Sequence, residues 1–163
     1  MAIRVKKAER SDAPALLELV KALADYEKLA PPTDEAQARL ILDGWPESGP
    51  ARFCAWLAEA DDPANGGHTA VGYAITFFTY SSFLARPTLY IEDIFILPDQ
   101  RRSGAGTALF QALKSEAEQT GCGRMEWVVL DWNTSAQQFY QKLGAVHLAD
   151  WQYYRMALDE VME

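Results

Sequence analysis

The chain has 163 residues, of which 49% are hydrophobic and 23% are charged, and its formal net charge at pH 7 is −8. A chain of this length is expected to form a single domain, residues 1–163, whose core needs neither a metal nor a disulfide. The acidic balance argues against nucleic acid and anionic membrane as partners, and no apolar run of 18 residues predicts a membrane span. Because the first ten residues have no apolar stretch behind their charges, we expect a cytoplasmic protein.

Cysteine and histidine are sparse in the sequence. Cys54 and Cys122 show neither redox nor metal-ligand spacing, and His68 and His147 lie far apart. We therefore expect structural thiols and no metal, and a catalytic histidine is a poor hypothesis.

The first third of the chain reads as a strand followed by two helices. Alternation over residues 3–7 predicts a short strand. Apolar residues at helical spacing predict a helix within residues 10–29. Two prolines end it, and a second helix is expected within residues 31–44, with Thr33 as its cap and Gly44 at its end.

The rest of the chain alternates between strands and helices. Strands are predicted at 51–60, 69–82, 88–97, 124–130 and 151–158, and helices at 106–121 and 134–145. Antiparallel strands followed by a β-α-β segment predict an α+β fold, with a mixed, mostly antiparallel central sheet flanked by helices.

The segment Arg101–Thr107, with sequence RRSGAGT, joins a predicted strand to a predicted helix. The first N–H groups of a helix lack internal partners and carry partial positive charge. The two glycines leave room for close approach, and the two arginines add charge, so the turn can hold a pyrophosphate. It lacks the lysine of a P-loop, and Leu109 stands where a dinucleotide fingerprint needs its third glycine. A helix that simply begins with a flexible turn is the alternative.

Two motifs extend this interpretation to a family. The R-x-x-G-x-G pattern at Arg101–Gly106 resembles the acetyl-CoA signature of the GNAT acyltransferase superfamily, and N-x-x-x-x-x-F-Y-x-x-x-G-A at Asn133–Ala145 resembles its second signature. The stretches ADYEKL, FFTY, LYIEDIFI, WNTSAQQFY and KLGA resemble the diamine (spermidine/spermine) acetyltransferases and their thialysine-acetylating relatives. The resemblance covers nearly the whole chain. It implies the GNAT fold, acetyl-CoA as co-substrate and a homodimer.

Acetyl transfer to a primary amine requires a group that accepts the ammonium proton, whose pKa is about 10.4. Glu92, just before the glycine turn, is the candidate, and the resemblance gives it the same role; a solvated strand carboxylate is the alternative. Tyr140 matches the family's general acid, which would protonate the departing CoA thiolate, or it is a core aromatic. No nucleophile is placed for a covalent acyl-enzyme, so direct transfer is expected.

The resemblance also implies which residues bind the coenzyme. The backbone at Ile94, Phe95 and Ile96 would bind the pantetheine arm and the acetyl oxygen. The other expected contacts are Arg101, Arg102, Ser103, Gly104, Ala105, Gly106, Thr107, Asn133, Ser135, Ala136, Tyr140 and Lys142. Asn133 is alternatively an ordinary helix N-cap, and Lys142 a solvated side chain.

The acceptor amine is expected to meet mostly carboxylates and aromatic rings. The resemblance implies that Tyr26 and Glu27 contact it, and the other expected contacts are Glu92, Asp93, Glu126, Trp127 and Gln152. Solvated or packed positions are the alternatives for Glu27, Glu126 and Trp127. In a regular strand Asp93 would face away from Glu92, but the family typically bulges this strand, which changes the faces.

Gln152 stands where the diamine enzymes carry a glutamate. This departure makes a shorter amine with one positive tail, such as thialysine, a competitor to spermidine and spermine. Acetylation of a protein N-terminus or lysine, and a non-catalytic acyl-CoA sensor, are further alternatives. The presence of both Glu92 and Tyr140 argues against the sensor.

Overall fold

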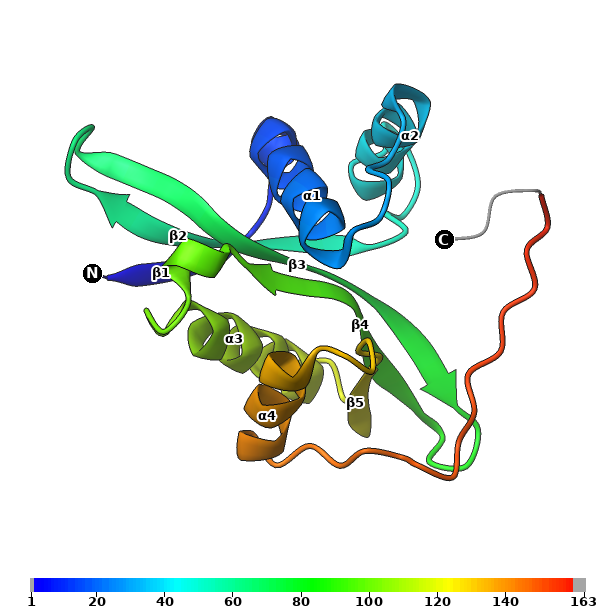
Figure 1. The fold of residues 1–163 in the computed structure, drawn as a ribbon. Helices are drawn as coiled ribbons and strands as arrows, with labels where there is room; N and C mark the ends of the chain where they lie inside the picture. Colours follow the sequence, from blue (N-terminus) through cyan, green and yellow to red (C-terminus); the bar gives the residue numbers. More distant parts are fainter. Residues whose placement is uncertain (1, 160–163) are drawn as a thin grey trace. The chain divides into compact units, whose positions relative to one another are not determined.

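The computed structural model describes residues 2–159, which divide into two compact units, residues 2–127 and residues 128–159. The first unit contains a five-stranded sheet with the strand order β1-β2-β3-β4-β5 (Figure 1). The first four strands pair antiparallel, and β5 pairs parallel with β4. The predicted α+β class, with a mixed and mostly antiparallel sheet, is confirmed, whereas a single domain stays a prediction.

The elements of the first unit follow the predicted order. Its strands are β1 (Ile3–Lys7), β2 (Cys54–Asp62), β3 (Gly67–Ser81), β4 (Arg86–Ile96) and β5 (Arg124–Trp127). Its helices are α1 (Ala13–Glu27), α2 (Asp34–Gly44) and α3 (Ala105–Gln119), and short 3-10 turns span Arg10–Asp12 and Pro98–Gln100. The second unit contains α4 (Thr134–Lys142).

Within the first unit, α1 and α2 lie on one face of the sheet and α3 lies on the other (Figure 1). Leu16 and Leu19, at helical spacing on α1, pack with Tyr73 and Phe95 of the sheet. On the opposite face Ala105 of α3 packs against small and apolar residues of β2 and β3. The central strands are therefore covered on both faces.

The second helix begins and ends where the sequence predicts. The Thr33 hydroxyl accepts a hydrogen bond from the Ala36 N–H at 3.2 Å, and α2 ends at Gly44. A Cβ atom on Gly44 would lie 2.7 Å from Cζ of Phe53, so a larger residue at this helix end would force the ring to shift.

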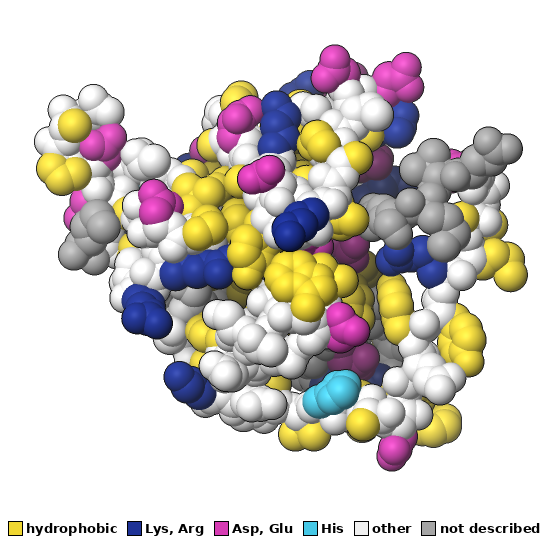
Figure 2. All heavy atoms as spheres, in the orientation of Figure 1, with side chains coloured by type: hydrophobic (Ala, Val, Ile, Leu, Met, Phe, Trp, Pro, Cys, Tyr) yellow, Lys and Arg dark blue, Asp and Glu magenta, His cyan; other side chains and the backbone are white. Residues whose placement is uncertain are grey.

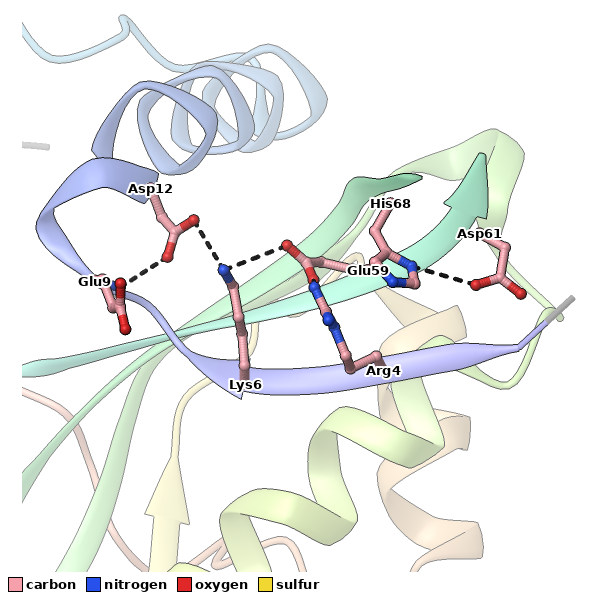
Figure 3. Close-up of polar contacts among 7 residues, drawn as sticks. All are labelled: Arg4, Lys6, Glu9, Asp12, Glu59, Asp61 and His68. Carbon is pink, nitrogen blue, oxygen red and sulfur yellow. Dashed lines mark hydrogen bonds and ion pairs between the residues drawn. The ribbon is translucent and has the colours of Figure 1, made fainter. Parts of the chain in front are cut away.

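A charged network ties the N-terminal strand to its surroundings (Figure 3). Glu59 is 8% exposed, and its side chain accepts a hydrogen bond from Arg4, while Nζ of Lys6 lies 3.6 Å from its other oxygen. The same Nζ donates to Oδ1 of Asp12 at 3.0 Å, and Oδ2 of Asp12 accepts the Glu9 N–H at 2.8 Å. These contacts hold β1 against β2 and against the turn that leads into α1.

Two of the predicted strands differ from the structure: one is shorter than predicted, and the other does not form. The strand predicted at 124–130 ends at Trp127, because its ladder with β4 ends at the pair Ile91↔Trp127, immediately before an irregularity in β4. The segment 151–158 forms no strand. The described part of its unit, residues 128–159, contains no strand that could supply the hydrogen bonds of a ladder.

Some large hydrophobic side chains remain at the surface. Phe83, in the hairpin between β3 and β4, is 100% exposed. Figure 2 shows hydrophobic side chains (yellow) reaching the surface among charged ones. Within residues 2–159, each helix falls short of the length and hydrophobicity that crossing a bilayer requires.

The network around Asp12 predicts a pH-dependent contribution to stability. Burial works to raise the pKa of Asp12, but the Glu9 N–H and the Lys6 ammonium hold that pKa below its ordinary value. A lowered folded-state pKa stabilises the protein above the unfolded value of about 3.9, and the contribution is lost as the pH falls through the folded pKa. Asp12→Asn should therefore lower the free energy of unfolding at pH 7 by about 0.5–1 kcal/mol, and should flatten its decline below about pH 4.

Urea unfolding followed by circular dichroism between about pH 2 and pH 8 measures both effects. Asp43→Asn is the matched control, because Asp43 pairs with Arg52 on the surface, where the side chains are 49% and 78% exposed. The control should change stability by a few tenths of a kcal/mol at most. Equal losses in the two variants, with parallel pH profiles, would contradict the prediction.

Candidate active site

One extra residue in β4 sets which side chains face each side of the sheet. Ile75 of β3 pairs with Asp93, and the next residue, Thr76, pairs with Ile91, so Glu92 is the inserted residue. Because Ile75 and Thr76 point to opposite faces of β3, their partners Asp93 and Ile91 do so too. The bulge expected from the family resemblance is confirmed.

The bulge brings Asp93 to a buried tyrosine. Tyr73 is 0% exposed, and its hydroxyl donates a hydrogen bond to Oδ2 of Asp93 at 3.0 Å. Tyr73 pairs with Phe95 in the ladder, so Asp93 is its diagonal neighbour, within reach of a long side chain. Tyr73 is not among the predicted site residues, because a tyrosine in an apolar strand is typical of the protein core.

Three carboxylates act on the Tyr73 hydroxyl. Burial, followed by the negative charges of Asp93, Glu27 and Glu92, raises the pKa of Tyr73 far above its ordinary value. The phenol therefore stays protonated at physiological pH. Glu27 is the last residue of α1, while Glu92 and Asp93 lie at the bulge, so the structure brings together three of the predicted acceptor residues.

The glycine turn has the strand-to-helix geometry that the sequence predicts. Arg102 and Gly104 adopt positive φ values of 63° and 87°, and α3 begins at Ala105. A Cβ atom on Gly104 would meet no other atom within 4 Å, so the turn opens onto free space at this residue. The Ser103 hydroxyl donates to the Gln100 carbonyl at 2.7 Å and accepts the Ala105 N–H at 3.3 Å, which shapes the loop.

Arg101 connects this turn to the end of α1. Its guanidinium carbon lies 4.6 Å from the centre of the Tyr26 ring, and Nη1 donates to the Tyr26 hydroxyl at 3.4 Å. Nε of Arg101 donates to the Ile96 carbonyl at 3.4 Å. The Tyr26 ring packs on Phe95, with 5.9 Å between the ring centres. A residue predicted for the coenzyme thus stacks on one predicted for the acceptor.

The backbone predicted to bind the coenzyme arm lies beyond the point where β4 and β5 pair. Their ladder runs from Thr88↔Arg124 to Ile91↔Trp127. The next residues of β4, 94–96, pair with β3 on their other side. In the described ladders, β5 therefore does not extend along Ile94–Ile96, and the edge of β4 that faces away from β3 is not paired with a strand at these residues.

The two predicted acceptor residues on β5 face opposite sides of the sheet. Trp127 pairs with Ile91, and its ring lies 5.4 Å from that of Phe110 on α3, which supports the packing alternative. Glu126 forms an ion pair with Arg124. By alternation along the strand, Glu126 points to the other face from Trp127.

The second unit carries the remaining predicted residues. Asn133 caps α4, because its Oδ1 accepts the Ala136 N–H at 3.2 Å. Tyr140 lies in α4, and its ring packs at 62° to that of Phe139. Ser135, Ala136 and Lys142 lie on the same helix, and Oε1 of Gln152 accepts the Tyr154 hydroxyl at 2.8 Å.

Comparison with known proteins gives this architecture a family. Residues 16–145 match the model of the acetyltransferase (GNAT) family. The chain is 30% identical to thialysine N-epsilon-acetyltransferase of Bos taurus, over 99% of this chain and 96% of that protein. It is 28% identical to spermidine/spermine N(1)-acetyltransferase-like protein 1 of Homo sapiens, over 98% of this chain and 23% of that protein.

A solved structure of the aminoglycoside acetyltransferase AAC(6')-Iy, in complex with a CoA bisubstrate analogue, superposes with a TM-score of 0.70. The two sequences are 21% identical, and the match covers 96% of this chain and 99% of that chain, which shows the shared fold. The chain belongs to the acetyltransferase (GNAT) family and is an acetyl-CoA-dependent transferase. The family and fold expected from the two motifs are confirmed.

Proposed function

We propose that this protein moves the acetyl group of acetyl-CoA directly to a primary amine of a small cationic substrate. The observation that carries the proposal is the group of carboxylates, Glu27, Glu92 and Asp93, whose charges act on one buried hydroxyl at the β4 bulge. Such a group favours a positively charged ligand. The Arg101–Tyr26 contact ties it to the glycine turn.

Two kinds of acceptor fit this group of carboxylates. A polyamine or diamine carries a second cation at a distance, and a thialysine-like amino acid carries one amine tail. The names of the bovine and human relatives support both classes. Because the Tyr26 ring is already stacked by Arg101, we assign the cation-binding role to the carboxylates of Glu27 and Asp93.

The glycine turn fits the diphosphate of the coenzyme. Gly104 has the positive φ that glycine adopts readily, faces open space, and lies beside Arg101 and Arg102 at the start of α3. The backbone of residues 94–96 would hold the arm of the coenzyme. When bound, acetyl-CoA supplies a thioester as the acetyl donor.

Residues of this chain would then accept and donate the protons of the reaction. Glu92 accepts a proton from the ammonium, directly or through water, and so frees the lone pair that forms the new C–N bond. As the C–S bond breaks, Tyr140 donates its proton to the sulfur, and the second proton of the attacking nitrogen leaves to solvent, so that a neutral amide forms. A backbone N–H in the segment 94–96 stabilises the negative charge that develops on the acetyl oxygen.

We predict that Glu92→Gln and Tyr140→Phe each lower kcat by about 10²–10⁴-fold, because each removes one proton-transfer group. The assay mixes the protein with acetyl-CoA and a panel containing spermidine, spermine and thialysine, and follows the free thiol. Glu118→Gln is the control, since its side chain is 69% exposed on α3. Absence of turnover by the wild-type protein with every amine would refute the proposed function.

A second prediction concerns the coenzyme turn. Gly104→Ala and Gly49→Ala both place a Cβ atom at positive φ, 87° and 79°, with nothing within 4 Å. Each should lower the free energy of unfolding by about 1 kcal/mol. Only Gly104→Ala should also weaken CoA binding, which calorimetry measures. Equal CoA affinity in the two variants would remove the turn from the coenzyme site.

We also propose a homodimer in the cytoplasm. Exposed Trp151, Tyr153 and Tyr154 support association, and the free cysteines Cys54 and Cys122 suit a reducing compartment. Sedimentation equilibrium should give twice the chain mass of 18.2 kDa. A mass of one chain at micromolar concentration would contradict the dimer.

A further inference from the structure

The hydroxyl of Tyr73 has a role that core packing does not explain. The ring is buried among α1 and sheet residues, where phenylalanine would fill nearly the same space. A buried hydroxyl needs a hydrogen-bond partner, and here that partner is Oδ2 of Asp93 at 3.0 Å. The hydroxyl therefore serves the contact with Asp93.

The Tyr73 ring is held on several sides. Its centre lies 6.5 Å from that of Phe95 in an edge-on arrangement, and Phe95 packs in turn on Tyr26. Leu16 and Leu19 of α1 belong to the same core cluster. The hydroxyl is thus a donor fixed in place by packing, which is what a precise ligand contact requires.

The proton of this hydroxyl is also fixed. Burial and then the charges of Asp93, Glu27 and Glu92 raise the pKa of Tyr73, so the phenol acts as a donor and does not exchange its proton with the reaction. The Tyr73 hydroxyl therefore offers Oδ2 of Asp93 a hydrogen-bond donor whose position and protonation are both fixed.

We propose that Tyr73 is a positioning residue for the acceptor: its hydroxyl orients Asp93, so that Asp93 binds a cationic group of the amine. The inference rests on the proposed function, and it adds a residue of β3 to the acceptor site. Tyr73 acts through Asp93 and does not touch the reacting atoms.

Tyr73→Phe is the direct test, because it removes only the hydroxyl. The KM for the amine should rise about tenfold or more, the size expected for one hydrogen bond to a charged group. The kcat at saturating amine and the KM for acetyl-CoA should change less than about twofold. Tyr80→Phe, in the same strand but 67% exposed, is the matched control and should match the wild type. An unchanged KM for the amine in Tyr73→Phe would overturn the inference.

A double-mutant cycle separates positioning from a general structural effect. Asp93→Asn should raise the KM for the amine by itself, and adding Tyr73→Phe should then change it less than about twofold. Effects that multiply would show that Tyr73 acts independently of Asp93, which overturns the inference. Asp93→Glu provides a second variant that keeps the charge but moves the carboxylate; unchanged amine affinity there would also overturn it.

Calorimetric titration of spermidine and thialysine into the CoA-loaded protein gives a readout independent of turnover. Weaker amine binding by Tyr73→Phe than by the wild type supports the inference, even if the wild-type protein transfers no acetyl group. Absence of acetyl transfer refutes only the proposed function. Equal binding in the two proteins overturns the inference and leaves the proposed function standing. Failure of both amines to bind the wild-type protein overturns both.

Discussion

Between Ile91 and Asp93 the strand β4 carries one residue more than β3 opposite, and the site is arranged around that insertion. Without it, Ile91 and Asp93 would share a face of the sheet. With it, Ile91 pairs with Thr76 while Asp93 lies on the face of Tyr73, beneath α1. A bulge of this kind redirects side chains at the cost of local pairing, and the ladder with β5 ends just before it.

The same face connects the β4 bulge to the glycine turn. Phe95 packs on Tyr73 and on Tyr26, and Tyr26 is stacked by Arg101. Arg101 also binds the Ile96 carbonyl at the end of β4. A series of direct contacts therefore runs from Asp93 to the glycine turn, all within the first unit, so both ends depend on the same packed aromatic rings.

Local signals in the sequence predicted the elements well, because periodicity and caps depend on neighbouring residues. The Thr33 cap, the turn at Gly104 and the central strands are of this kind. The Tyr73–Asp93 bond depends on strand register and on a bulge, and the Arg101–Tyr26 contact joins residues 75 positions apart. The predicted strand at 151–158 failed because a strand needs a partner, which alternation in one segment does not reveal.

The charges around Tyr73 also bear on what binds there. Burial and the negative charges of Asp93, Glu27 and Glu92 all favour the neutral form of the Tyr73 phenol. A cationic ligand bound beside these carboxylates would interact with the folded state alone and would therefore stabilise the protein. Under the proposed function, the same negative charges that keep the phenol neutral would favour a cationic amine as the acceptor.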